Sequence, residues 1–426
     1  MQRLAAFLRT YWTRGVPGRP TPESATVLML RWWLVAFAFK VLGSSWDVSW
    51  HFKWIRDDFA PPHLLNTVGT GIAIVLVLVH TFTGYGADRK SLRIIQTGTI
   101  VFVIAGPIDV INHRINGLDI TSWSPSHMLL YTGTAIMIAG VWRNWWINYP
   151  RTGRFGWQYT AGLTAFGAFM FENAFFPNYQ QEYGILSIGA FFDGKPYAEP
   201  SLLAFAAKQI GHPVDAVAVQ HFSLPIPAWV YPVWTIALCA AVLVLTRILV
   251  GRAWTATVVA GAYVVYRMLI WPVLYYTIFP PSSVPFWLLA VGLAVDLAFV
   301  IPANPYVRAA LGAALVTAAG YGALLLQTVA EGTPVDLAKL PIDEMRAAHA
   351  SGANLHTPPV DWTSWWWAAL LLAVTWAGMT LFAQRTVGLT TPRPPAQTTV
   401  YAPEPRRNAQ GYLAGFDSPE PVSAEN

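Results

Sequence analysis

Apolar runs of about 20 residues recur along almost the whole 426-residue chain, and short polar segments separate them. A helix of that length crosses a bilayer while satisfying all of its own backbone polar groups, which a lipid environment requires. Charged residues make up only 12% of the sequence, about half of the fraction in a soluble domain. The sequence therefore predicts an all-α protein, a polytopic integral membrane helical bundle whose main partner is the lipid bilayer.

The apolar runs predict about ten transmembrane helices. They lie near 25–43, 64–84, 94–111, 127–142, 158–177, 226–249, 253–275, 284–301, 306–328 and 363–385. A cytoplasmic arm (1–24) precedes the transmembrane domain (25–386). The segment 387–426 is rich in Pro, Thr and Ala without apolar periodicity, which predicts a disordered cytoplasmic tail.

Every second connection between these spans is basic. The arginines and lysines on that side are Arg3, Arg9, Arg14, Arg19, Arg89, Lys90, Arg93, Arg143, Arg151, Arg154, Arg252 and Arg308, and the tail adds Arg393, Arg406 and Arg407. By the positive-inside rule we expect a multi-pass protein of the inner (plasma) membrane with both termini in the cytoplasm. The net charge of +5 is spread over these connections, so it indicates topology and implies no nucleic-acid partner.

A short polar pattern occurs twice, about sixty residues apart. In each copy a histidine follows an aspartate by four residues, a second histidine follows a proline-containing turn, and Gly-Thr comes six residues later. The copies are Asp47, His51 and His63, and Asp109, His113 and His127. Each copy joins two predicted spans, at 25–84 and 94–142, so the chain is expected to consist of repeated helical hairpins with both motifs on the outer side.

These residue types in this order favour metal binding. Residues four apart share a helix face, and the hairpin brings the second histidine back towards them. Two imidazoles and a carboxylate bind Cu(II), Fe(II) or Zn(II), and the Irving-Williams order favours copper. The alternative is that these side chains cap helices, pair with Arg56 or Arg114, or lie in water. Duplication of the pattern favours the metal interpretation, more strongly in the first copy.

Other polar residues are weaker candidates for an additional site or a second shell. Glu172 lies in a predicted span, where an ionisable group is costly and is either functional or hydrogen-bonded for structure. His212, Asp215 and His221 have a generic spacing that favours a solvated loop. His349 and His356 are similarly generic. His80 and Cys239, the only cysteine, are expected in the core, and a single cysteine excludes an intrachain disulfide.

The stretch DVSWHFKWIRDDFAPPH resembles the signature of the C subunit of copper membrane monooxygenases, the particulate methane and ammonia monooxygenases. In that family an Asp, a His four residues later and a second His after an Arg-Asp and Phe-x-Pro segment bind copper. The matching positions are Asp47, His51 and His63, and Trp50, Arg56, Asp57, Phe59 and Pro61 agree around them. The resemblance covers residues 46–75 and, more weakly, 108–138.

The resemblance implies a copper protein that hydroxylates a small apolar substrate with O2, alone or with partner membrane subunits. Iron and zinc are the alternative metals. Two other functions stay open: a permease or metal/proton carrier with an outer-side Asp/His site, and a non-catalytic structural membrane subunit. A carrier needs ionisable groups that continue towards the cytoplasm, and the sequence shows few of them.

Overall fold

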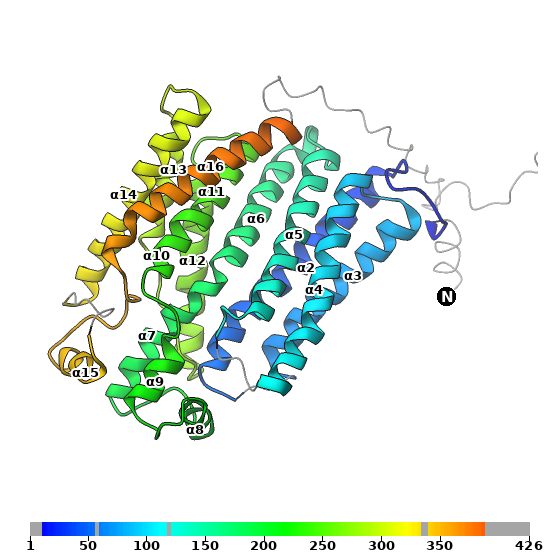
Figure 1. Ribbon diagram of the computed structural model, residues 1–426. Coiled ribbons are helices and arrows are strands. Elements are labelled where there is room, and N and C mark those ends of the chain that lie inside the picture. Colours follow the sequence, from blue (N-terminus) through cyan, green and yellow to red (C-terminus); the bar gives the residue numbers. More distant parts are fainter. Residues whose placement is uncertain (1–10, 56–58, 117–120, 334–339, 388–426) are drawn as a thin grey trace, which may run out of the picture.

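The structure is a computed structural model that describes residues 11–55, 59–116, 121–333 and 340–387, without the side chains of 113–116, 382, 383 and 385–387. Figure 1 shows a bundle of long helices. The α-helices are α2 (Glu23–His51), α3 (Pro61–Thr83), α4 (Arg89–Asn116), α5 (Pro125–Asn148), α6 (Gly156–Phe175), α7 (Tyr179–Phe192), α8 (Pro200–Gln209), α9 (Ala216–Ser223), α10 (Val230–Trp234), α11 (Ala240–Val250), α12 (Thr255–Tyr276), α13 (Leu288–Ala298), α14 (Pro305–Glu331), α15 (Ile342–Ala350) and α16 (Trp365–Val387).

Short elements complete the bundle. They are the 3-10 turns η1 (Gly153–Phe155), η2 (Phe176–Asn178) and η4 (Trp362–Ser364), and a π-helical segment, η3 (Thr235–Cys239), which joins α10 to α11. Within the described ranges the β pairing consists of one isolated bridge between Thr333 and Ala353. The all-α prediction is therefore confirmed for the described part of the chain.

Seven helical segments of the described chain are long and apolar enough to cross a membrane. They are Glu23–His51, Pro61–Thr83, Arg89–Asn112, Val230–Val250, Thr255–Tyr276, Pro305–Glu331 and Trp362–Leu381. Their lengths and composition are those of a multi-pass membrane protein, and each coincides with a predicted span.

Three of the ten predicted spans are not among these seven. The predicted span 127–142 lies in α5 and 158–177 mostly in α6; both helices are long enough, but polar residues such as Arg143 and Glu172 reduce their hydropathy. The third, at 284–301, contains α13, which has only 11 residues. Pro280, Pro281 and Pro285 precede α13 and delay its start, because proline cannot donate a helical hydrogen bond.

The two segments that carry the repeated motif form antiparallel helix pairs, α2 with α3 and α4 with α5. In each pair the two helix backbones approach closely at the glycine of the Gly-Thr dipeptide. Gly69 lies against Ala36 and Lys40, and Gly133 lies against Gly98 and Phe102. Ala36 and Gly98 come eleven residues before the motif aspartate, and Lys40 and Phe102 come seven before it. The two pairs therefore pack at equivalent positions.

The bundle has two adjoining apolar cores. One forms mainly between α2, α3, α5 and α6, and the other extends over α6 to α16. Buried aromatic rings such as Trp33, Trp145 and Trp376 fill them, and Cys239 is buried as expected. His80 is also buried, where it accepts a hydrogen bond from Trp33 and its other ring nitrogen contacts the carbonyl of Tyr85, so the prediction of a satisfied core histidine is confirmed.

The short helices α8, α9 and α15 gather at one end of the bundle (Figure 1). The last residues of α2 reach this end, where the carbonyl of Lys53 accepts a hydrogen bond from the backbone N–H of Glu199. Residues 11–22 and the end of α16 lie at the opposite end. The repeated motif is thus at the end of the molecule away from both described termini.

Candidate metal centre

Asp47, His51 and His63 are brought together by the ends of α2 and α3. Asp47 and His51 lie one turn apart on one face of α2, which ends at His51. α3 begins with Pro61 and Pro62, at positions where a helix needs no N–H donor, so His63 falls in its first turn. Because the two helices are antiparallel, the last turn of α2 faces the first turn of α3.

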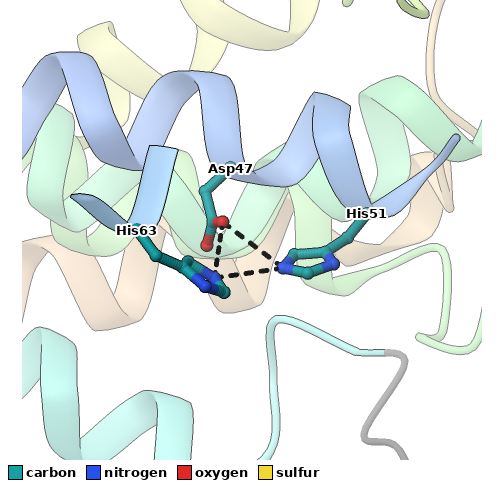
Figure 2. Close-up of side chains that lie close together, drawn as sticks. All are labelled: Asp47, His51 and His63. Atoms are coloured by element: carbon teal, nitrogen blue, oxygen red, sulfur yellow. Dashed lines mark hydrogen bonds and ion pairs between the residues drawn. The ribbon is translucent and has the colours of Figure 1, made fainter. Parts of the chain in front are cut away.

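The three side chains direct one donor atom each at a common point (Figure 2). Asp47 Oδ1 lies 3.3 Å from His51 Nε2 and 2.9 Å from His63 Nε2. The two Nε2 atoms lie 3.3 Å apart. Metal–nitrogen bonds of about 2.0–2.1 Å place neighbouring donors about 2.8–3.4 Å apart in square-planar or tetrahedral shells. The spacing of this triad therefore fits a transition-metal ion.

The hydrogen bonding of the triad supports the same fit. Asp47 Oδ1 is buried and accepts no hydrogen bond of acceptable geometry, although both imidazoles lie beside it. Two imidazole nitrogens that face each other cannot both carry a proton there, so at least one presents a lone pair. The three donor atoms lie close enough together to hold a cation, and the two imidazoles can alternatively hydrogen-bond to each other.

The triad opens into a cavity of about 510 Å³. Apolar side chains line most of it, including Phe37, Phe102, Leu130, Ile138 and Phe169. The three triad side chains line this cavity and are 23–32% exposed, although Asp47 Oδ1 itself is buried. The cavity is large enough for a small organic molecule and offers it mainly apolar walls.

Part of the second motif copy lines the same cavity. Asp109 Oδ1 lies 3.4 Å from His127 Nε2 and accepts a hydrogen bond from Ser126 at 2.8 Å. His127 Nδ1 contacts the carbonyl of Thr121 at 2.8 Å. His113 belongs to α4, but its side chain lies outside the described part of the chain. The structure brings together Asp109 and His127 of this copy, and places them on the cavity that the triad shares.

Glu172 of α6 also lines this cavity. Its carboxylate is buried and accepts hydrogen bonds from Ser45 at 2.7 Å and from Tyr179 at 2.9 Å. Ser45 precedes Asp47 by two residues, so Glu172 links the second core to the segment that carries the triad. The hydrogen bonds agree with the structural interpretation of Glu172, and a function at the cavity stays a prediction.

The remaining candidates lie away from the triad. Asp215 caps the start of α9 and lies 3.1 Å from His212, and both side chains are exposed. A hydrogen bond from the backbone N–H of Ala218 lowers the pKa of Asp215. His221 is exposed on α9, and none of the three lines the cavity. This agrees with the solvated loop favoured from the sequence. Arg56 and Asp57 lie outside the described residues.

The two late histidines have separate partners. His349 of α15 lies 2.8 Å from Asp193, which follows α7, and His356 accepts a hydrogen bond from Ser283 through its backbone carbonyl. Both therefore help to hold together the segments at the end of the bundle where α8, α9 and α15 lie. The sequence alone had indicated no specific role for either histidine.

Sequence reasoning missed a buried ionic network. Arg267 of α12 pairs with Glu182 of α7 at 2.5 Å and donates to Tyr263 at 2.8 Å. Tyr263 donates to Tyr179, which donates to Glu172, so the network reaches the cavity wall. The sequence did contain a signal for this network. Arg267 lies inside an apolar run, and a charge inside a membrane span needs a partner.

Lys40 was also missed, although it lies in a predicted span and lines the cavity.

No family model, curated protein or solved structure matches this chain. Its function therefore has to be inferred from its own residues and their arrangement.

Proposed function

We propose that this chain is a membrane-embedded metal-binding protein that holds copper through Asp47, His51 and His63. The convergence of one carboxylate oxygen and two imidazole nitrogens within 3.3 Å of one another carries the proposal. Nitrogen-rich donor sets of this kind favour copper over iron and zinc by affinity. The resemblance of residues 46–75 to the C subunit of copper membrane monooxygenases points to the same metal.

The proposed reaction is hydroxylation of a small apolar substrate with O2. A copper ion bound here would supply oxygen activation. Asp47, His51 and His63, which line the cavity, would hold the ion beside the space in which a substrate would bind. The aromatic walls bind an apolar molecule and exclude water, while Ser45 and Tyr179 hold the Glu172 carboxylate in a fixed position on the cavity surface.

The second motif copy is proposed to contribute to the same cavity rather than to a distant centre. Asp109 and His127 have the residue types of metal ligands, and His113 completes the pattern in sequence. In the second copy, Asp109 Oδ1 accepts a hydrogen bond from Ser126. In the first copy, the equivalent oxygen, Asp47 Oδ1, accepts no such hydrogen bond. This difference supports stronger metal binding by the first copy.

The proposed topology has ten spans in five hairpins, in the plasma membrane, with cytoplasmic termini and the motifs at the outer side. α5 and α6 support the additional spans, because α5 packs along α4 from Gly133 to Gly140 and so runs at the same membrane depth. The basic connections support the orientation. Partner membrane subunits or a homo-oligomer would complete the assembly.

Metal analysis of the purified full-length protein tests the proposal. We expect about one copper ion in the first site, lost in Asp47→Ala and in His51→Ala, because either change removes a ligand. His212→Ala and Asp215→Ala are matched controls, since they remove the same residue types from an exposed pair outside the cavity. Metal content that is unchanged in the triad variants contradicts the metal site.

Product analysis separates an enzyme from the other functions. The copper-loaded protein is supplied with a small alkane, O2 and a two-electron reductant, and the alcohol is measured. Alcohol formation that disappears in Asp47→Ala supports the monooxygenase. Copper binding without alcohol contradicts this reaction and leaves a carrier or a structural subunit, which metal flux into vesicles then distinguishes.

A further inference from the structure

Lys40 places a buried amino group on the wall of the cavity, away from the triad. It lies on α2, seven residues before Asp47, and both side chains line the cavity. Seven residues of helix span about 10 Å, so the Cα of Lys40 lies about two turns deeper along α2 than the Cα of Asp47. The Lys40 side chain is only 3% exposed. A charge in such a position is costly and indicates a function by default.

The neighbours of Lys40 Nζ are all neutral. It donates hydrogen bonds to Asn66 Oδ1 at 2.9 Å and to Thr70 Oγ1 at 3.2 Å, and it lies 3.6 Å from the centre of the Phe102 ring. Each of these groups solvates a cation, but none carries a compensating negative charge. Within the described part of the chain, the ammonium group forms no ion pair.

The repeat shows that packing does not require this charge. Phe102 occupies the position in the second helix pair that Lys40 occupies in the first, and each lies against the glycine of its pair. Similarly, Leu130 in the second pair corresponds to Asn66 in the first. Apolar side chains thus occupy these two positions in the second helix pair, whereas a lysine and an amide occupy them in the first. The polar set therefore has a role beyond packing the helices together.

We propose that Lys40, Asn66 and Thr70 form a binding site for the carboxylate of an amphiphilic organic acid. A single ammonium group complements a monoanion, and the hydroxyl and amide beside it provide further hydrogen-bonding groups. Most of the remaining cavity surface is apolar and suits an alkyl chain of medium length, while Asp109, His127 and Glu172 are among its polar lining residues. The carboxylate would lie at Lys40 and the far end of the chain near the triad. Binding at Lys40 needs no metal.

Equilibrium binding of decanoate and 1-decanol to the full-length protein in lipid nanodiscs tests this site, with binding to empty nanodiscs subtracted. We expect the wild-type protein to bind decanoate more tightly than 1-decanol. Lys40→Met should weaken decanoate binding about tenfold or more, the effect of losing a charge-assisted hydrogen bond, and leave 1-decanol binding unchanged. Lys53→Met is the matched control, because Lys53 bonds to the carbonyl of Ile278 and does not line the cavity.

Equal affinity of the wild-type protein for decanoate and 1-decanol overturns the inference without any variant. Equal decanoate affinity in the wild type and Lys40→Met also overturns it. If Lys40→Met does not fold, Asn66→Leu, which introduces the residue of the second pair, should weaken decanoate binding selectively. Asp47→Ala should keep decanoate binding even where it loses metal, so failure of the metal site and failure of the acid site are separate results.

Discussion

Substitution of Gly69 by alanine should weaken metal binding without touching a metal ligand. A Cβ at this position would lie 2.6 Å from the carbonyl oxygen of Ala36 and 3.0 Å from the backbone nitrogen of Lys40, whereas ordinary contact begins at 3.4 Å. Close-packed backbones cannot absorb this overlap, so α3 must move away from α2 by about 0.8 Å. His63 is carried on α3, while Asp47 and His51 are carried on α2.

A ligand set tolerates a displacement of only about 0.5 Å before binding suffers. We therefore expect copper affinity to fall by about tenfold to a hundredfold in Gly69→Ala, the range seen when the supporting residues of a metal site are lost. Overpacking should also cost about 1–3 kcal/mol of stability. Copper affinity is measured by competition with a chelator of known strength, and stability by the thermal unfolding midpoint in detergent.

Two controls isolate the displacement. Gly71→Ala adds the same methyl group two residues along the helix, where nothing lies within 4 Å, and should leave copper affinity unchanged. Gly133→Ala produces a similar clash in the other helix pair, 2.7 Å from the Phe102 nitrogen, and should preserve the triad. A folded Gly69→Ala protein with the copper affinity of the wild type would refute the reasoning.

Three further predictions concern stability. Arg267→Met should lower the unfolding midpoint by leaving Glu182 buried and unpaired, at a cost of about 3–5 kcal/mol, and adding Glu182→Gln should restore part of it; no restoration contradicts the pairing. Burial raises the pKa of Asp88, but hydrogen bonds from Ser91 and Arg143 outweigh it and lower the pKa overall. The stability that Asp88 contributes should therefore be complete above its ordinary pKa of about 3.9 and disappear as the pH falls through the lower value, so the midpoints of wild type and Asp88→Asn should converge in acid. Copper at a hundred times its dissociation constant should stabilise the wild type by about 2.7 kcal/mol and leave Asp47→Ala unaffected; equal shifts in both would place the binding elsewhere.

The sequence predicted the triad because its chemistry is encoded locally. Asp47 and His51 are one helical turn apart, and Pro61 and Pro62 announce the start of the next helix just before His63. Prediction of the long apolar helices succeeded for the same reason, since hydropathy is a local property. In contrast, α8, α9 and α15 lie in polar connections that were read only as loops, because short helices of this kind depend on the surfaces they cover.

The pairing of Glu182 with Arg267 could not be predicted, because 85 residues separate them and no spacing rule links the two. Lys40 was missed for a related reason. One lysine in an apolar run suggests a span end or a snorkelling side chain, whereas its burial and its contact with Phe102 show that it lies inside the bundle. Residues whose roles depend on distant partners become visible only when the helices are assembled.

All three triad residues lie at helix ends. Their arrangement in space therefore depends on how α2 and α3 pack, and not on the number of residues that connect the two helices. Twelve positions separate His51 from His63, whereas fourteen separate His113 from His127, so the connecting segment has already changed length between the copies. Insertions or deletions between the helices should therefore be tolerated in evolution. A search for relatives should treat the motif as two short anchors, Asp-x-x-x-His and Pro-x-His or Pro-His, joined by a gap of variable length.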